Sequence, residues 1–534
     1  MEIRSVMIGN EKEAFVENRF KKGLNIISSD DNNKGKTIVI QSMMYAMGNE
    51  PIFPSSFPYE EYYHVVEFEQ EGKIIKICRK KNTFVVIKNG NLHLYDSLPE
   101  FKRFLKNNIF ELPVIVKKGM KKIVDPVLFF QIFFVGQDKK NTSTIFNNGY
   151  YNNQDFINML YSYLDIPLFI DDDINQDAIN RKITSLKAEK ELLKQENKIL
   201  KSNTDVSRIV NLSADRYRLE EQLRKIDKLK NEIINLVNYR NRAITRRLKN
   251  EVTLKELRSL NQTLSVGELY CIECKSTNIG YTTKGNNCAF DVSSIEIRNQ
   301  IIESIKDRID SYTEEIDNIT DDINNRQLKL KEILSVDDVN LESILFMKSD
   351  ISTASNADKR IMDIDKEIKD LKESIKIREN NKEEFREKKN KLYKSLSDEM
   401  YKVYRIISPD GNLNFEGLFS KRNDVYSGSE GNEFYIAKMI SLANILKHNY
   451  PIIIDCYRDG ELSSVKEERV LNIIRNLKNQ VILTVTLKEE ENNKYSLLRD
   501  INNIKYDNNE VCKLLNKQDV EDLQKQLEAF AIIL

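Results

Sequence analysis

A Gly-Lys-Thr triplet near the N-terminus has the surroundings of a phosphate-binding loop. Residues 23–37 read GLNIISSDDNNKGKT, and a helix-forming stretch follows at residues 38–47. A strand, a polar turn and a helix in this order let backbone N–H groups and the helix N-terminus hold phosphates. Lys36 would reach the β- and γ-phosphate oxygens, and Thr37 would ligate Mg²⁺. We therefore predict nucleotide contacts from Asn32, Asn33, Lys34, Gly35, Lys36 and Thr37.

This loop departs from the usual GxxxxGK[ST] pattern at two positions. Asp30 replaces the first glycine, and its carboxylate would repel phosphate unless it turns outward. Asn33 stands where related ATPases often have a further glycine. Asparagine adopts positive φ more readily than most residues, so it is a workable substitute there. The alternative interpretation is a chance Gly-Lys-Thr turn in front of a helix.

A second candidate for metal chemistry lies more than four hundred residues downstream. The apolar strand PIIID (residues 451–455) ends in the carboxylate of Asp455. A hard cation such as Mg²⁺ prefers oxygen ligands, so Asp455 would hold it through water. The segment continues as Cys456-Tyr-Arg-Asp459-Gly-Glu461, and either Asp459 or Glu461 could supply a base for hydrolysis from further along. We predict Glu461 as the catalytic carboxylate.

Two polar segments complete the set of candidate residues. Residues 426–433 read YSGSEGNE, and a helical stretch follows at 434–447. Its candidate nucleotide contacts are Ser427, Gly428, Ser429 and Glu430. Gln137 follows an apolar run in the sequence FFVGQD, residues 133–138. The alternative for the first segment is an ordinary Ser/Gly turn that begins a helix.

The order of these motifs resembles that of the SMC, RecN and zinc-hook DNA-repair ATPases. In that family the Walker A loop lies near the N-terminus, and the signature (LSGGE) and Walker B motifs lie beyond a coiled coil. The resemblance implies that the loop at Ser427 caps the γ-phosphate bound on the opposite subunit, so that ATP joins two heads. It also implies that Gln137 senses Mg²⁺ and the attacking water. Cys456 replaces the family's catalytic glutamate, so ATP hydrolysis is expected to be slow.

Other features resemble the SMC-like ATPases of bacterial anti-phage systems of the Lamassu type. They are the loop DDNNKGKT, the Gln137-Asp138 pair, the stretch IDCYRDGEL, the small size and the lack of a histidine after strand 481–486. This resemblance implies ATP and Mg²⁺ as cofactors and head dimers that sense DNA ends or foreign DNA. The implied partners are a second copy of the chain, double-stranded DNA, a separate effector or nuclease subunit and an accessory subunit. A general repair ATPase of the RecN or SbcC type and an ATP-binding tether with negligible turnover are the alternatives.

Two long helical stretches separate the motifs. Residues 168–266 contain neither glycine nor proline, and residues 286–408 again contain neither. Long uninterrupted helices exclude both residues, so an arm that goes out and returns is predicted. The fold class is an α/β ABC-type ATPase head, assembled from N- and C-terminal halves, with a long antiparallel coiled coil between them. The predicted divisions are 1–167 (head), 168–266 (outgoing helix), 267–288 (apex), 289–408 (returning helix) and 409–534 (head).

Apolar residues at alternating three- and four-residue steps support the arm, because such steps keep one seam facing a partner helix. In the outgoing helix the predicted seam is Leu219, Leu223, Ile226, Ile233 and Val237, with Lys230 at the missing core position. In the returning helix it is Ile302, Ile305, Ile309, Tyr312, Ile316, Ile319 and Ile323. An elbow is expected within residues 335–359, where the repeat lapses. A compact helical bundle is the alternative.

A Cys271-Ile-Glu-Cys274 pair lies at the expected apex. The resemblance to zinc-hook ATPases implies a zinc site here, with Cys271 and Cys274 as two of four ligands. A second subunit could supply the other two ligands, or Cys288 could help to close a site within one chain. A redox pair or an incidental pair are the alternatives.

The overall composition limits the partners. The 83 basic residues balance 83 acidic ones, so the whole chain has no general attraction to nucleic acid. DNA contact would need local patches, and the candidates are Lys117, Lys118, Lys121 and Lys122, or Arg246 and Arg247. No apolar stretch approaches the roughly 20 residues that span a bilayer, so we expect a cytoplasmic protein without a membrane partner.

Overall fold

The computed structural model describes most of the chain. The described residues are 1–117, 120–137, 141–146, 149–167, 187, 207–266, 280–281, 289–346, 383, 385–413, 415, 417–421, 424, 426–458, 462–491 and 493–533. They belong to two compact units. The first unit comprises Met1–Leu168, Val252–Arg308 and Lys389–Leu534, and the second comprises Phe169–Glu251 and Ile309–Lys388.

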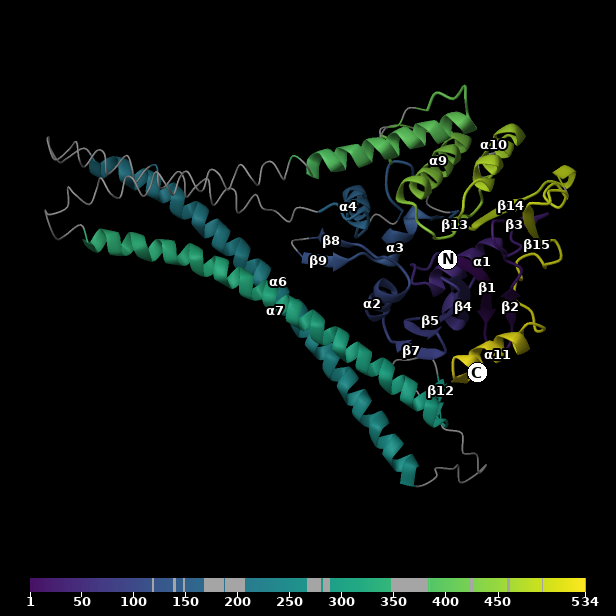
Figure 1. Cartoon of the computed structure of the whole chain (residues 1–534), viewed down its shortest axis with the longest axis horizontal. Coiled ribbons are helices and arrows are strands. Elements are labelled where there is room, and N and C mark those ends of the chain that lie inside the picture. Colours follow the sequence, from purple (N-terminus) through teal and green to yellow (C-terminus); the bar gives the residue numbers. More distant parts are fainter. Residues whose placement is uncertain are drawn as a thin grey trace. The chain divides into compact units, whose positions relative to one another are not determined.

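A five-stranded parallel sheet forms the centre of the first unit (Figure 1). Its strands in spatial order are β10 (Phe134–Val135), β13 (Ile452–Ile454), β14 (Val481–Thr486), β3 (Leu24–Ser29) and β15 (Ile501–Lys505). All neighbours are parallel, with Leu24 opposite both Val481 and Ile501. Strand β3 from the N-terminal part therefore lies between two strands from the C-terminal part. All six residues of β3 are buried, as expected for the central strands of a parallel sheet.

A six-stranded antiparallel sheet packs on the other side of helix α1 (Lys36–Ala46). Its strands in spatial order are β2 (Ala14–Glu17), β1 (Glu2–Gly9), β4 (Tyr63–Gln70), β5 (Lys73–Lys80), β6 (Thr83–Lys88) and β7 (Asn91–Tyr95). Helix α1 contacts β1, β4 and β5, and nine of its eleven residues are buried. The helix that follows the Gly-Lys-Thr triplet is thus enclosed by the core and has little freedom to shift.

Shorter elements cover this core. Helix α2 packs on β6 and β7, and α11 packs on β1 and β2. The remaining elements of the first unit are α2 (Leu98–Asn108), β8 (Val114–Lys117), β9 (Met120–Ile123), α3 (Pro126–Phe129), α4 (Asn153–Tyr163), α9 (Gly428–Leu446), α10 (Ser464–Arg475) and α11 (Val520–Ala529). Short 3-10 turns lie at Tyr59–Glu61, Phe130–Ile132 and Glu489–Glu491, and residues 385–407 are helical.

Helices α6 (Ser207–Val266) and α7 (Ile295–Phe346) form an antiparallel pair (Figure 1). Asn261 donates to Asn299 over 3.2 Å near one end of the pair. Arg326 donates to Glu232 over 3.1 Å further along. Partner numbers rise along one helix as they fall along the other, which defines the antiparallel direction.

The seam of this pair follows the predicted repeat in α7 and differs from it in α6. Among the predicted seam residues of α7, Ile309 is half-buried and the other six are buried, namely Ile302, Ile305, Tyr312, Ile316, Ile319 and Ile323. In α6 the buried residues Leu229, Leu236 and Ala243 recur every seven positions, whereas Lys230 is exposed. The prediction of Lys230 at a core position is wrong. A register shifted by one residue buries Leu229 and keeps the ammonium in water, which avoids the cost of burying a charge.

The turn between the two helices differs from the expected distal apex. Strand β12 (Ala289–Asp291) pairs with β11 (Gly280–Tyr281) and with β16 (Ile532–Ile533), the last strand of the chain. Residues 252–308 accordingly belong to the same unit as the parallel sheet. The sequence pattern found the hairpin but could not specify which end lies beside the head, because strand pairing between residues 289 and 533 leaves no local trace.

The expected elbow is only partly covered by the structure. Helix α7 continues through residues 335–346, so no break occurs there. The rest of the expected elbow lies outside the described residues. Within the described part of the chain, no helix has the length and apolar content needed to span a membrane.

Candidate functional site

The candidate site lies where the central strands of the parallel sheet end. Strand β3 ends at Ser29, β13 is followed by Asp455, and β14 ends at Thr486. These three strands are adjacent and parallel, so their carboxyl ends meet at one edge. The carboxyl edge of an open α/β sheet is where ligands bind in this type of architecture. Polar side chains that are far apart in sequence therefore converge on one place.

The loop between β3 and α1 has the backbone that the sequence predicted. Asn33 has a φ of 58° and Gly35 a φ of 89°, both in the left-handed region. The proposal that Asn33 replaces a glycine at a positive-φ position is confirmed. The side chain of Asp30 is 55% exposed and lies 3.7 Å from the Lys34 ammonium. It has thus turned outward, which removes the objection that its carboxylate would repel phosphate.

Helix α1 presents an N-terminus that is free to bind an anion. Its N-cap is Gly35, which has no side chain to occupy the first N–H groups, and its first turn contains no acidic residue. The Lys36 side chain is buried and donates to Asp31 O over 3.2 Å, to Thr486 Oγ1 over 3.1 Å and to Ser29 Oγ. Burial lowers the pKa of the Lys36 ammonium from its usual value. A cation and a helix N-terminus therefore face the same loop, as a phosphate site requires.

The Thr37 hydroxyl lies close to two other predicted residues, Gln137 and Asp455. It lies 2.9 Å from Gln137 Oε1 and 3.4 Å from Asp455 Oδ1. Thr37 and Asp455 are 418 positions apart, and Gln137 is 100 positions from Thr37. Asp455 is fully buried at the end of β13, whereas Gln137 is exposed. Hydroxyl, amide and carboxylate oxygens at one point form the ligand set that Mg²⁺ prefers.

Two threonines of β14 that were not predicted from the sequence belong to the site. The Thr484 hydroxyl donates to Asp455 Oδ1 over 2.5 Å and accepts from the backbone N–H of Cys456 over 2.7 Å. The Thr486 hydroxyl donates to Asn32 Oδ1 over 2.9 Å. The available signal was two hydroxyl residues at the carboxyl end of the apolar strand VILTVT.

Cys456 occupies the position directly after the acidic residue in a left-handed conformation, with a φ of 57°. A left-handed conformation is unfavourable for a residue with a Cβ by about 1 kcal/mol. The Thr484 hydroxyl and the hydrogen bond from Tyr457 N to Thr484 O, at 3.2 Å, hold this turn. The backbone after Asp455 is therefore anchored to the neighbouring strand.

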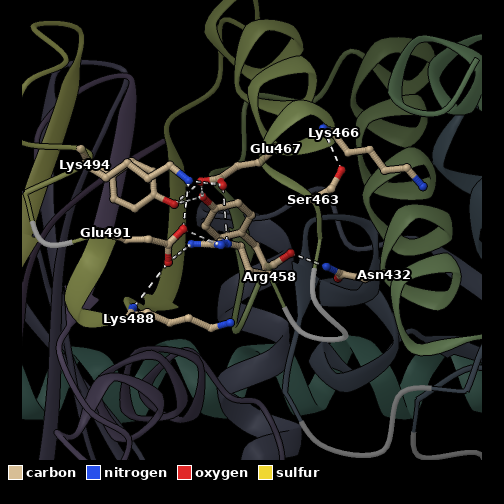
Figure 2. A network of polar contacts seen from close by, with 10 residues as sticks. Asn432, Arg458, Ser463, Lys466, Glu467, Lys488, Glu491 and Lys494 are labelled. Carbon is tan, nitrogen blue, oxygen red and sulfur yellow. Dashed lines mark hydrogen bonds and ion pairs between the residues drawn. The ribbon is translucent and has the colours of Figure 1, made fainter.

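A polar network fixes the segment that follows (Figure 2). Arg458 donates two hydrogen bonds to Glu491, at 2.9 and 2.8 Å. Glu467 is only 1% exposed and accepts from Tyr457 at 2.8 Å and from Lys494 at 2.7 Å. Hydrogen bonding by Arg458 is the main reason that the pKa of Glu491 falls to about 2. This network connects the turn after β13 with α10 and with the loop after β14.

The Ser/Gly segment lies at the start of α9. Ser427 is the N-cap, and a reciprocal capping box joins it to Glu430, whose carboxylate accepts from Ser427 N over 2.8 Å. Ser427 and Gly428 are exposed. No hydrogen bond among the described residues joins this segment to Lys36 or Thr37. Further along α9, Asn432 donates to the carbonyl of Tyr457, so the helix is attached to the turn after β13.

The side chain of Lys34, a predicted nucleotide contact, is occupied by contacts within the protein, and its role toward a nucleotide stays a prediction. Its ammonium donates to Asp507 O over 3.1 Å and to Asn509 O over 2.7 Å. The side chain therefore binds main-chain carbonyls from the C-terminal part of the chain. The GKT pattern could not show this, because the acceptors lie more than 470 positions away.

Several other predicted residues lie outside the described part of the chain. They are Glu461, Asp459, Asp138, Lys118, Cys271, Cys274 and Cys288. Glu461 as a base and zinc at the Cys271–Cys274 pair thus stay predictions. Among the described residues no group of three or more His, Cys, Asp and Glu side chains is arranged to hold a metal ion.

The two candidate DNA patches are partly occupied by internal contacts. Lys117 forms an ion pair with Asp155, and its side chain is only 12% exposed. Lys122 donates to the hydroxyl of Tyr150 over 2.7 Å. Arg247 lies 3.3 Å from Glu251, whereas Arg246 is exposed. Lys117 is therefore not available for a phosphate without breaking its ion pair.

The sequence is similar to two curated proteins, both named Lamassu protein LmuB. The protein from Bacillus cereus (strain VD014) is 23% identical over 551 residues, covering 96% of this chain and 94% of the relative. The protein from Bacillus sp. (strain NCIM 5461 / CCTCC AB 2011126 / NIO-1130) is 22% identical over 512 residues, covering 85% and 87%. No family model matches the sequence. The predicted resemblance to the Lamassu-type SMC-like ATPases is confirmed by these two relatives.

Two solved structures of archaeal Smc head domains are similar over nearly the whole chain. The Pyrococcus yayanosii Smc head domain with a coiled coil and joint is 12% identical with a TM-score of 0.38, covering 99% of each chain. The Pyrococcus furiosus Smc head domain with an extended coiled coil, bound to the C-terminal domain of ScpA, is 12% identical with a TM-score of 0.30, covering 99% and 98%. The described residues of this chain form a parallel sheet with the β3–α1 loop at its carboxyl edge, together with the antiparallel α6–α7 pair.

Proposed function

We propose that this chain is the SMC-like ATPase subunit of a Lamassu-type anti-phage system, in which ATP-bound heads pair, sense DNA and control a separate effector. The observation that carries the proposal is the position of the Thr37 hydroxyl, within hydrogen-bonding distance of both Gln137 and Asp455. The similarity to LmuB over 96% of the chain supports the defence context.

Each residue of the site has a proposed role in binding Mg²⁺ and ATP. The backbone N–H groups at residues 32–36 and the N-terminus of α1 would hold the phosphates. Lys36 would leave its present acceptors and neutralise the β- and γ-phosphate oxygens. Thr37 and Gln137 would ligate Mg²⁺, and Asp455 would hold it through water. Thr484 would orient Asp455 for this task.

The exposed start of α9 is the proposed contact for the nucleotide of a second copy. Ser427 and Gly428 are exposed, and the capping box holds their backbone in place. Ser427 N–H donates to Glu430, and the Ser427 hydroxyl oxygen accepts from Glu430 N–H. The hydroxyl hydrogen and the first N–H groups of α9 could then donate to a γ-phosphate. ATP would then lie between two heads and stabilise their association.

A second candidate function is an ATP-dependent tether with negligible turnover. Cys456 favours it, because a cysteine thiol stands where the family has a catalytic carboxylate. Its left-handed backbone is fixed by Thr484, so the turn cannot easily bring another residue to this position. Slow hydrolysis would need a base from the segment after Arg458, for which Glu461 is our candidate.

ATP binding and turnover by the purified chain test these proposals. Wild type, Lys36→Ala and the exposed control Lys12→Ala would be compared for Mg²⁺-ATP affinity and phosphate release, with and without linear double-stranded DNA. We expect Lys36→Ala to lose at least tenfold in ATP affinity, because the Lys36 ammonium contacts the loop at Asp31 O. Lys12→Ala should match wild type, because Lys12 is an exposed residue outside the loop. Failure of the wild type to bind ATP refutes the proposal.

Measurements of ATP hydrolysis and of dimer formation distinguish the ATPase from the tether. DNA-stimulated hydrolysis that disappears in Lys36→Ala and Glu461→Gln supports the ATPase and excludes the tether. Nucleotide-dependent dimers without turnover support the tether. A bulky Ser427→Arg change should abolish dimers in sedimentation experiments while monomers still bind ATP. Protection of cells against phage, with the neighbouring genes co-expressed, should require Lys36; protection against DNA breaks alone would favour a repair ATPase instead.

A further inference from the structure

The phosphate-binding loop is attached to a segment near the end of the chain. Residues 507–514, which we call the brace, follow β15 and contact the loop at several points. Asp507 Oδ1 accepts from Asp30 N over 3.0 Å, and Cys512 N donates to Asn33 O over 2.9 Å. Asn509 Nδ2 donates to Lys34 O over 3.2 Å. The loop is thus hydrogen-bonded to the brace both at Asp30 and at Asn33 and Lys34.

Lys34 makes the strongest connection between loop and brace. Its ammonium donates to Asn509 O over 2.7 Å and to Asp507 O over 3.1 Å, and it lies 3.7 Å from the Asp30 carboxylate. The side chain is only 10% exposed. A charged donor gives a hydrogen bond roughly twice as strong as a neutral one. This ammonium therefore makes two hydrogen bonds and one ion pair, all with groups of the protein.

The brace also packs closely against Gly35, the residue directly before helix α1. A Cβ added at Gly35 would lie 2.5 Å from Leu514 Cδ1, so the brace touches the backbone at this glycine. Gly35 also has a φ of 89°, a conformation that residues with a side chain rarely adopt. The brace therefore supports the loop at the residue where it turns into α1.

This loop needs outside support more than a standard loop does. Asn33 holds a left-handed conformation, which asparagine adopts less readily than the glycine that related loops often have there. Fixing the backbone of a polar loop costs conformational entropy at every residue. A loop that is already ordered before the nucleotide arrives does not pay this cost during binding.

From these contacts we infer that the Lys34 side chain positions the loop: its ammonium binds the brace, holds the phosphate-binding loop in its binding conformation and does not contact the phosphates. This inference rests on the proposed ATP binding at the same loop. It assigns opposite tasks to two lysines that are two positions apart. Lys36 faces the nucleotide side of the loop, and Lys34 faces the C-terminal segment.

Nucleotide affinity in four single variants of the full-length chain tests the inference. Lys34→Met removes the hydrogen bonds from the ammonium to the brace, and Lys34→Arg keeps a charged donor. Asn509→Ala removes a separate contact, the hydrogen bond from the Asn509 side chain to the Lys34 carbonyl. Lys517→Met is the control, because Lys517 is exposed beyond the brace. The dissociation constants of Mg²⁺-ATP and Mg²⁺-ADP would be measured, together with the melting temperature without nucleotide.

We expect Lys34→Met to weaken binding of both nucleotides about tenfold, the effect of losing one charged hydrogen bond of about 1.4 kcal/mol. Lys34→Arg should stay within about threefold of wild type, and Asn509→Ala should lose about threefold to tenfold. The double variant Lys34→Met/Asn509→Ala should lose less than the product of the single effects, because both changes release the same loop. The melting temperature should change little in the control.

The outcomes separate this inference from the proposed function. If the wild type does not bind ATP, the proposed function fails. If the wild type binds and Lys34→Met binds equally well, only the inference fails. If Lys34→Met is weak while Asn509→Ala equals wild type, Lys34 contacts phosphate directly and the positioning role is overturned. If Lys34→Met does not fold, the nucleotide affinities of Asn509→Ala and Lys34→Arg still test the inference. Unchanged affinity in Asn509→Ala would contradict a supporting role of the brace in nucleotide binding.

Discussion

Replacing Thr484 with valine removes one hydroxyl group from the site while keeping the shape of the side chain. Thr484 is 1% exposed in the middle of the parallel sheet, so no water can replace the lost group easily. Its hydroxyl donates to Asp455 Oδ1 over 2.5 Å and accepts from Cys456 N over 2.7 Å. The change therefore releases the acidic side chain and leaves a backbone N–H without its acceptor.

The size of the effect follows from these two bonds. A hydrogen bond to a charged group contributes about 1.5–3 kcal/mol, and a buried unsatisfied donor costs about 1–3 kcal/mol. The two losses are not additive, because Asp455 also lies 3.4 Å from the Thr37 hydroxyl, so we expect a destabilisation of about 3 kcal/mol. Part of this appears as a less ordered Asp455. We expect the affinity for ATP to fall about tenfold in Mg²⁺ and less than threefold in EDTA, given 1.4 kcal/mol per decade.

The assay is the dissociation constant of ATP with and without Mg²⁺ for wild type, Thr484→Val and Thr484→Ser. The serine variant keeps the hydroxyl and should stay within about threefold of wild type in both conditions. Equal losses with and without Mg²⁺ would mean that the hydroxyl supports the sheet and not the metal-binding carboxylate. Wild-type affinity in the valine variant would refute the reasoning outright.

Three further changes test other parts of the structure. Gly35→Ala should lower ATP affinity at least tenfold, because the new Cβ would lie 2.5 Å from Leu514 in a left-handed backbone; wild-type affinity by calorimetry would contradict this. Glu491→Gln should destabilise the chain by about 1 kcal/mol at pH 7, a value reduced for solvent screening of the partly exposed pair with Arg458. Because the folded pKa of Glu491 is about 2 against 4.5, its contribution is present above pH 4.5 and is lost as the pH falls toward 2, so thermal melts of wild type and variant should converge in acid; a constant gap would contradict the ion pair. Ile316→Ala should destabilise the α6–α7 pair by about 2–3 kcal/mol, and hydrogen exchange should accelerate there but not in the sheet; Ile316→Val, as control, should cost about 1 kcal/mol.

Local sequence patterns were sufficient for the elements that carry the site. The strand before the Gly-Lys-Thr triplet, the strand ending at Asp455 and strand 481–486 are all present with nearly the predicted bounds. Asn33 has positive φ as its residue type suggested. These features depend on the conformations and burial that each short segment favours, so they could be predicted without knowledge of the rest of the chain.

Contacts between distant segments could not be predicted in the same way. The contact between Thr484 and Asp455 requires that β14 lies next to β13. The hydrogen bond from Lys34 to the Asn509 carbonyl requires that residues 507–509 lie beside the loop. The heptad pattern was misassigned by one residue at Lys230, because the register of a coiled coil is decided by what the partner helix can bury.

Sequence patterns alone predicted the strand, turn and helix around the Gly-Lys-Thr triplet, the strand that ends before Asp455 and the helical hairpin between them. They could do so because phosphate-binding loops, strand ends and helical repeats depend on the chemistry of neighbouring residues. The tertiary structure was needed to show that the Lys34 side chain binds the C-terminal segment, and that β12 pairs with β16. Both are contacts between segments more than 240 positions apart, where the free energy of contact, and not local preference, selects the partner.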